Sequence, residues 1–181
     1  MKKIIIVLTA LLVSYAAIAQ EDKSVREPEG YSGFLEHSLI YRLADRNYTT
    51  VGLTTTHGLY FNGNTFVGIG CGFEGGDDFF AMPIFTAVKY NFGYSKPATA
   101  TIQLRLGSCV SEKTGPYADI AAGVRFGSKQ KKFAVNVMLT GTYYTPYNYY
   151  GYVWDDVAGT SQRISITKNR SGVGLRVGIE W

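Results

Sequence analysis

Apolar and polar residues alternate along most of the chain after residue 30, in segments of about ten residues separated by turn residues. This period of two is typical of β-strands with one apolar face. Eight such segments are present, approximately Tyr31–Tyr41, Tyr48–Gly58, Thr65–Glu74, Phe80–Asn91, Thr99–Val110, Tyr117–Phe126, Phe133–Tyr144 and Ser171–Trp181. We therefore predict an all-β chain with eight antiparallel strands.

The final segment separates the two kinds of residue most cleanly. One of its faces is wholly apolar and consists of Val173, Leu175, Val177, Ile179 and Trp181. Its other face carries three glycines and two charged residues, Gly172, Gly174, Arg176, Gly178 and Glu180. A soluble β-sandwich rarely has so glycine-rich a second face. The pattern instead indicates a small barrel with a crowded polar interior and an apolar outer surface.

Aromatic residues gather near the segment ends. Tyr41 and Tyr48 flank the first long connection. Three short turns follow in order, and beside them lie Tyr60 and Phe61, then Tyr90 and Phe92, then Phe126 and Phe133. We interpret them as two aromatic girdles at the two surfaces of a membrane. At about 3.3 Å per residue and a tilt of about 40°, a segment of this length spans roughly 25 Å, the height of a lipid-facing band.

The first residues form a segment of a different kind. Two lysines, an apolar run and the small residues 17–19 predict a secretory signal peptide over residues 1–19, which is cleaved on export through the inner membrane. The apolar run is too short to span a bilayer. We expect a polar periplasmic leader over residues 20–30 and a barrel domain over residues 31–181. Nothing in the charge of the chain indicates a nucleic-acid partner.

The chain resembles the small eight-stranded outer-membrane β-barrel proteins of diderm bacteria. The most specific feature is the terminal segment Val177-Gly178-Ile179-Glu180-Trp181, and weaker similarity to an uncharacterised subgroup lies in residues 56–62, 82–85 and 122–127. The resemblance implies an up-and-down barrel in the cell outer membrane, surrounded by lipid and lipopolysaccharide. It further implies that Val177, Ile179 and Trp181 form a signal for the outer-membrane assembly machinery.

Charged residues fall on the inward-facing positions of this predicted barrel. The alternation places Glu74, Lys89 and Gln103 there, together with a candidate charge ladder of Glu36, Arg105, Asp119, Arg125, Arg176 and Glu180. Eight strands enclose so little space that we favour a salt-bridged plug, with a narrow ion or small-solute pore as the alternative. Because barrel closure makes the last strand the neighbour of the first, we expect Arg176 to pair with Glu36.

Few residues suggest catalysis or metal binding. His37 and His57 are predicted to face outward about five positions apart, roughly 16 Å, which is too far for one metal or one catalytic dyad. Thr55 precedes His57 on the same face. Cys71 and Cys109 fall on opposite faces, so we expect two free thiols. We predict no catalytic residue, no metal site and no cofactor, and a lipid-modifying enzyme ranks third among the functions considered.

The longest connection is rich in aromatic residues and is predicted to face outward from the cell. It contains Tyr147, Tyr149, Tyr150, Tyr152 and Trp154. Such rings stack on sugars or dock a protein partner. We favour a second interpretation, in which the hairpin extends beyond the membrane with Ile164 and Ile166 opposite and its rings rest in the lipopolysaccharide headgroup layer, because no polar residues are arranged around the rings as in a dedicated site. The sequence thus favours a non-enzymatic outer-membrane protein with a structural, adhesive or partner-binding role, ahead of the pore.

Overall fold

The structure is a computed structural model. It describes residues 30–43, 48–61, 63–76, 79–93, 96–110, 114–127, 133–145, 147–155, 160–168 and 170–181, the two ranges 147–155 and 160–168 by their backbone alone. The predicted signal peptide and all of the predicted leader except Gly30 lie outside the described residues.

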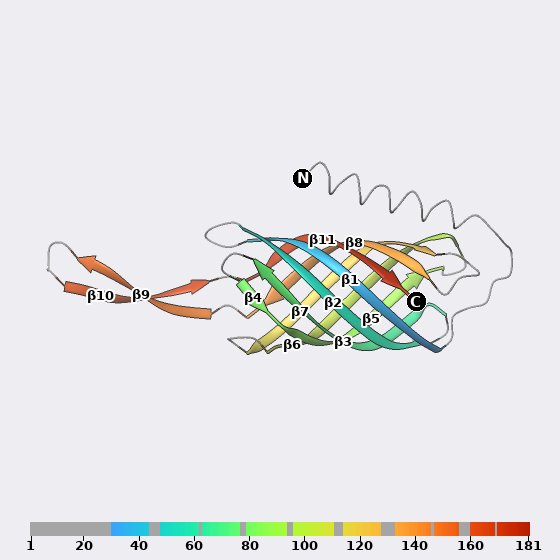
Figure 1. The fold of residues 1–181 in the computed structure, drawn as a ribbon, viewed down its shortest axis with the longest axis horizontal. Helices are drawn as coiled ribbons and strands as arrows, with labels where there is room; N and C mark the ends of the chain where they lie inside the picture. The colour runs from blue at the N-terminus through green and yellow to red at the C-terminus, as the bar shows by residue number, and fades with distance from the viewer. Residues whose placement is uncertain are drawn as a thin grey trace.

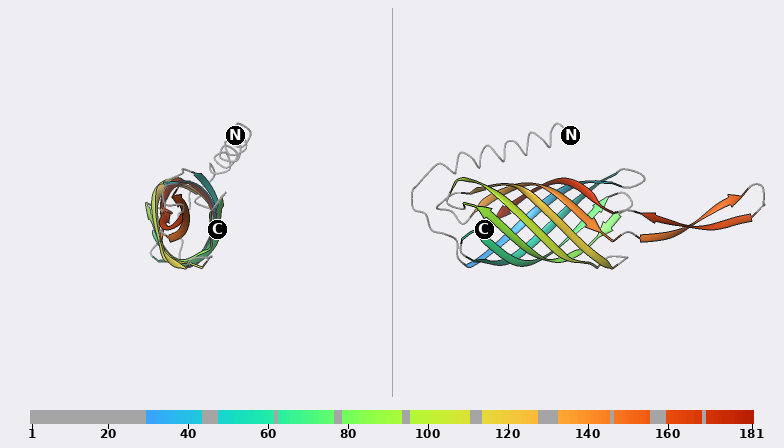
Figure 2. Two further views of the ribbon diagram at one scale, coloured as in Figure 1. Left: turned by 90° about the vertical axis from the view of Figure 1, so that its left-hand side faces the viewer. Right: turned by 180° about the vertical axis from the view of Figure 1, so that it is seen from behind.

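Nine strand segments form one antiparallel sheet that closes on itself. They are β1 (Gly30–Arg42), β2 (Tyr48–Phe61), β3 (Thr65–Gly76), β4 (Phe79–Ala81), β5 (Pro83–Phe92), β6 (Ala98–Cys109), β7 (Gly115–Gly127), β8 (Ala134–Tyr144) and β11 (Gly172–Glu180). β1 pairs with β2 on one side and with β11 on the other, and β11 pairs with β8. The closed ring is visible end-on in Figure 2. The predicted eight-stranded, up-and-down barrel is confirmed, with β4 and β5 as two parts of the fourth strand.

The fourth strand is interrupted at Met82, where the sequence predicts a continuous strand. The register with β3 is the same on both sides of the break, since Glu74 faces Ala81 and Cys71 faces Ile84. The break coincides with Pro83, which has no backbone N–H to donate to β3. The other edge stays bonded, because the N–H of Val110 donates to the carbonyl of Met82 at 2.9 Å.

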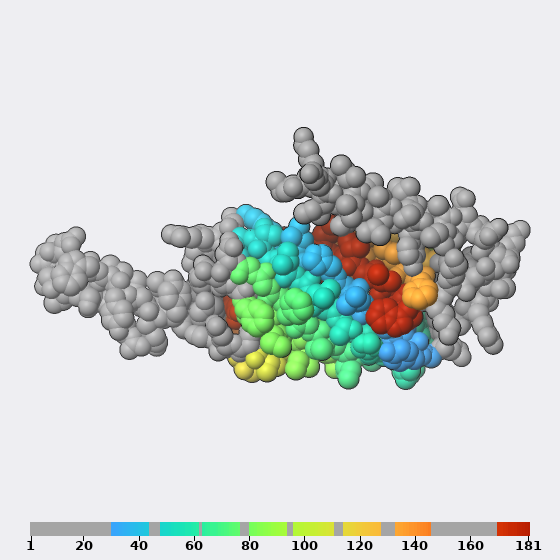
Figure 3. Space-filling view, viewed as in Figure 1, coloured from blue at the N-terminus to red at the C-terminus, as the bar shows by residue number. Residues whose placement is uncertain are grey.

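The outer surface of the barrel is apolar. Its middle is covered by exposed aliphatic side chains, among them Leu39, Ile69, Val88, Leu104, Ile120, Leu139 and Leu175. Exposed aromatic residues ring both ends, with Tyr31, Phe61, Tyr90, Phe92, Phe126, Phe133 and Trp181 at the end of the short turns and Tyr41, Phe73, Phe80 and Tyr143 at the other. Figure 3 shows the part of this surface formed by β1, β2, β3 and β11. Such an exterior is suited to a bilayer, with the aliphatic band against the hydrocarbon core and the aromatic rings at the two membrane–water interfaces. Within the described part of the chain, no helix is long and apolar enough to cross a membrane.

Tyr60 departs from the predicted girdle. Its side chain is buried, while that of the next residue, Phe61, is half exposed. The reason is the alternation of β2, which turns Tyr60 inward to pack against Phe66 with the ring centroids 5.4 Å apart. Tyr48 is also partly buried, against a cluster of residues inside the barrel. The direction of these rings therefore depends on the alternation along the strand and not on how close the residue lies to a turn.

The longest connection forms a separate two-stranded sheet. β9 (Tyr147–Asp155) and β10 (Thr160–Lys168) pair with each other alone, and the hairpin projects beyond the barrel at the end opposite the C-terminus (Figure 1). Ile164 faces Gly151 and Ile166 faces Tyr149 in the backbone register.

Candidate functional site: the barrel interior

The barrel interior is filled with charged side chains. Six cationic and four acidic residues of the described chain are buried there: Arg42, Lys89, Arg105, Arg125, Arg170, Arg176, Glu36, Glu74, Asp119 and Glu180. The structure places every predicted ladder residue inside the barrel, together with Glu74, Lys89 and Gln103. Because a buried charge is costly unless it is paired, the contacts of these groups decide what the interior can do.

The middle layer contains two ion pairs that cross the barrel. Arg105 of β6 pairs with Glu36 of β1. Arg176 of β11 pairs with Asp119 of β7 at 2.5 Å, and Thr140 of β8 donates to the same carboxylate oxygen at 2.5 Å. All four ionised groups are almost completely buried. This layer ties together five of the strands, β1, β6, β7, β8 and β11, through charge-assisted hydrogen bonds.

The predicted ion pair between Arg176 and Glu36 is wrong. In the observed register Glu36 faces Gly178 and Arg176 faces Ser38, so the two residues are diagonal and not opposite. Glu36 instead pairs with Arg105, and Arg176 pairs with Asp119, each on a strand that is not a neighbour of its own. Both residues remain members of one layer, but with different partners from those that strand adjacency suggests.

A second layer, near the short turns, is centred on Glu180. Its carboxylate accepts hydrogen bonds from Lys89 at 2.8 Å and from the Nε of Arg125 at 3.0 Å. Tyr60 and Asn136 donate to it at 3.0 and 3.2 Å. The Lys89 ammonium also lies 4.4 Å from the centre of the Phe34 ring, a cation–π contact. The Glu180 carboxylate thus accepts hydrogen bonds from four residues, two of them cationic.

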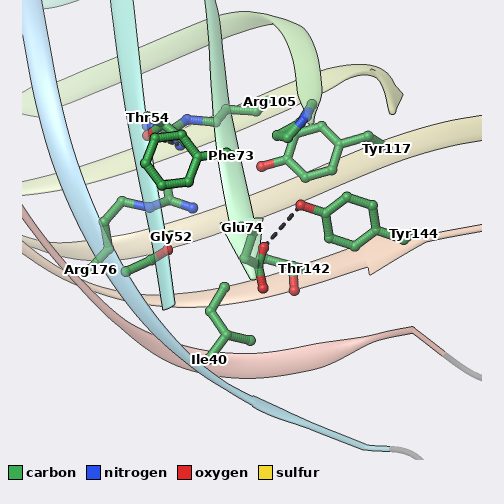
Figure 4. Close-up of a pocket in the computed structure, with 12 residues that line it drawn as sticks. Ile40, Gly52, Thr54, Phe73, Glu74, Arg105, Tyr117, Thr142, Tyr144 and Arg176 are labelled. Carbon is green, nitrogen blue, oxygen red and sulfur yellow. Dashed lines mark hydrogen bonds between the residues drawn. The ribbon is translucent and has the colours of Figure 1, made fainter. Parts of the chain in front are cut away.

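The third layer, at the hairpin end, is centred on Glu74. Arg42 and Thr50 bond one of its oxygens, and Tyr144 donates to the other at 2.9 Å (Figure 4). Arg42 also donates to the carbonyl of Arg170 at 2.6 Å, just after β10. Sequence reasoning missed Arg42 and Arg170. Arg42 shares the inward alternation of Glu36 but lies one residue past the predicted end of its strand, whereas Arg170 lies outside any strand and has no such signal.

A small cavity lies between the middle and third layers. Its volume is about 10 Å³, which is room for about one water molecule. It is lined by residues that include Thr54, Arg105, Tyr144 and Arg176 (Figure 4). At Gly52, which also lines it, a Cβ atom would lie 2.5 Å from the hydroxyl of Ser38. Ion pairs therefore occupy the described part of the interior at three levels.

The outward-facing candidates lie apart from this interior. His37 and His57 both face outward; Gly33 faces His57 across β1 and β2, so the two histidines are four positions apart and not five. Cys71 is exposed and Cys109 is buried, so the two thiols lie on opposite faces of the sheet, as predicted. The described residues contain no group of three or more His, Cys, Asp or Glu that could hold a metal.

The predicted assembly residues occupy the outer face of β11 and the position that follows it. Val177 and Ile179 lie on β11, and Trp181 exchanges two backbone hydrogen bonds with Gly33, at 2.9 and 3.0 Å. The candidate binding residues Tyr147, Tyr149, Tyr150, Tyr152 and Trp154 lie on β9. Their side chains are outside the described part.

Comparison with known proteins supports the fold assignment. The structure is similar to the crystal structure of Neisserial surface protein A (NspA), with a TM-score of 0.60 and 12% sequence identity over 83% of this chain and 96% of that one. The chain has the fold of the small outer-membrane β-barrels. Weaker matches are the N-terminal barrel domain of Pseudomonas aeruginosa OprF (TM-score 0.44, 16% identity, 84% of this chain and 99% of that one) and a major outer membrane protein of Thermus thermophilus (0.36, 12%, 84% and 99%). No protein-family model matches the sequence, and no curated protein matches it.

Proposed function

We propose that this chain is a non-enzymatic outer-membrane protein whose sealed barrel anchors the β9–β10 hairpin and whose hairpin contacts a partner outside the cell. The observation that carries the proposal is the contrast between the two parts of the chain. The barrel interior is occupied by ion pairs, whereas the hairpin pairs only with itself and extends away from the barrel.

The barrel supports the anchoring role. Its apolar exterior between two aromatic rings is suited to a bilayer, and its fold is that of small outer-membrane barrels. Ion pairs occupy its interior at three levels, and eight strands enclose little space, which favours a plug over a pore. The assignment to the outer membrane also fits the predicted signal peptide.

The hairpin supports the binding role by its length and composition. Nine paired positions at about 3.3 Å per residue give a ribbon of roughly 30 Å. The headgroup region of a bilayer is about 5–8 Å thick on each side, so the ribbon extends well beyond it. Tyrosine and tryptophan supply large contact areas at low entropic cost, which suits a protein surface or the faces of sugar rings.

The junction between hairpin and barrel is fixed. Arg42 bonds the carbonyl of Arg170, and the Arg170 guanidinium donates to the carbonyl of Phe80 at 3.3 Å across the barrel mouth. The same guanidinium lies 5.9 Å from the centre of the Tyr144 ring. These contacts hold the chain just after β10 against the third charged layer, so the barrel sets where the hairpin emerges.

The test compares three forms of the full chain purified from native outer membranes under mild conditions. One is unaltered, one has residues 146–169 replaced by Asn-Gly, and one keeps the hairpin but has Tyr147, Tyr149, Tyr150, Tyr152 and Trp154 replaced by serine. We expect a protein or glycan that is retained by the unaltered chain, is lost from both variants and binds the purified chain directly. Retention of the same components by all three forms would contradict a binding role for the hairpin.

A further inference from the structure

A small group of polar residues interrupts the apolar exterior near the end of the barrel that carries the short turns. It consists of Tyr31 on β1, Thr55 and His57 on β2, and Trp181 after β11, and we call it the interfacial patch. The Nδ1 atom of His57 lies 2.6 Å from the hydroxyl of Tyr31, and its Nε2 atom lies 2.9 Å from the hydroxyl of Thr55. Both ring nitrogens are therefore engaged by hydroxyl groups.

Trp181 completes the patch from the neighbouring strand. Its ring meets the His57 ring edge to face, with the centroids 6.2 Å apart. The Tyr31 ring stacks on the same His57 ring, with the centroids 6.0 Å apart. Gly33 makes this possible, because a Cβ atom there would lie 2.7 Å from two carbons of the Trp181 ring. The missing side chain lets the tryptophan lie across β1 toward the histidine.

The hydrogen bonds of the patch leave one donor unused. A neutral imidazole has one N–H and one lone pair, so it donates to one hydroxyl and accepts from the other. The hydroxyl that accepts keeps its own O–H free, whichever tautomer is present. Among the described residues neither Tyr31 nor Thr55 has a further hydrogen bond. An O–H facing hydrocarbon without an acceptor is costly, so this donor requires an acceptor from the surroundings.

We infer that the interfacial patch is a phospholipid site that donates a hydrogen bond to the phosphodiester of one bound lipid. The inference rests on the proposed membrane location. Aromatic rings at this level mark the boundary between acyl chains and headgroups. The free hydroxyl supplies the donor, and the rings of Tyr31 and Trp181, which both contact the His57 ring, supply apolar surface for the glycerol and the upper acyl chain.

His37 offers a matched control. It is the other outward-facing histidine, it lies on the neighbouring strand, and it has no hydrogen bond within the described residues. Replacing it removes an exposed imidazole without touching the patch. The hairpin offers a second control, because no residue of the patch belongs to it. Removing the hairpin should leave lipid binding unchanged, whether or not the hairpin binds a partner.

The experiment measures binding of phosphatidylglycerol to the full chain in detergent by native mass spectrometry. Each variant is first shown to be folded by its heat-modifiable mobility on gels, and a chain that fails to fold in detergent or vesicles would contradict the membrane location itself. We expect about fivefold weaker binding for the triple variant Tyr31→Phe, Thr55→Val and His57→Phe, which removes every hydrogen-bond donor among these three residues and so costs about one hydrogen bond to the lipid. His37→Phe should bind as tightly as the unaltered chain.

A diether analogue identifies the acceptor. It lacks the ester carbonyls but keeps the phosphodiester, so equal binding of the diester and diether lipids is expected. Loss of binding to the diether would overturn the assignment to the phosphate. Binding by the triple variant as tight as that of the unaltered chain, or an equal loss in His37→Phe, would overturn the site.

Discussion

Replacing Asp119 by asparagine should leave the Arg176 guanidinium charged and buried with neutral acceptors alone. Those acceptors are the amide oxygen of Gln103, at 3.3 Å, and the hydroxyl of Thr140, at 3.0 Å. Both members of the ion pair are almost inaccessible to water. Breaking a buried pair on one side costs about 3–5 kcal/mol, and Arg176→Met should cost a similar amount by stranding the carboxylate. The double variant strands neither charge, so the two residues should be coupled by about 2–3 kcal/mol.

The coupling is measured by reversible urea unfolding of the four proteins in lipid vesicles, followed by tryptophan fluorescence. A parallel cycle with Glu36→Gln and Arg176→Met supplies the control, since those two residues are diagonal across β1 and β11 and form no ion pair. We expect its coupling to be smaller by at least about 1 kcal/mol. Coupling of Arg176 to Glu36 that equals or exceeds its coupling to Asp119 would refute the assignment of partners.

Three further predictions concern the outer surface. Leu104→Arg, at mid-strand, should reduce the free energy of unfolding in vesicles by about 2–4 kcal/mol, whereas Phe92→Arg, at a strand end, should cost about 0–1 kcal/mol; equal costs would contradict the lipid-facing band. Gly33→Val should displace the Trp181 ring and reduce the same free energy by about 1–3 kcal/mol, and an unchanged value would contradict that close contact. Deletion of residues 177–181 should cause degradation or aggregation before membrane insertion, and normal amounts of the truncated chain in purified outer membranes would contradict an assembly role.

Alternation alone predicts which face of each strand is polar, because side chains of a β-strand point to opposite sides in turn. This is why Gln103 and Arg105 are correctly placed inside and Leu104 outside. The prediction fails where alternation is set aside. Closeness to a turn suggests an outward Tyr60, although the position of this residue in β2 directs it inward.

The partners inside the barrel are not predictable from strand order. Arg105 and Glu36 are 69 residues apart and belong to strands that are not neighbours. Their contact depends on the tilt and stagger of the closed sheet and on long side chains that cross a narrow space. The interfacial patch is only partly visible in the sequence. Thr55 and His57 lie two apart on one strand and Tyr31 reaches them through the pairing of β1 with β2, but Trp181 joins them only when β11 pairs with β1 and closes the barrel.

Single-channel recording in planar lipid bilayers tests the sealed interior most directly. The unaltered chain should give no stable open steps at moderate voltage, because three layers of paired charges fill the barrel over its described length. A variant that breaks the middle layer, Arg105→Ala with Arg176→Ala, shows under the same conditions what an opened barrel conducts. Steady ohmic conductance of the unaltered chain would contradict the plug and establish the barrel as a narrow pore.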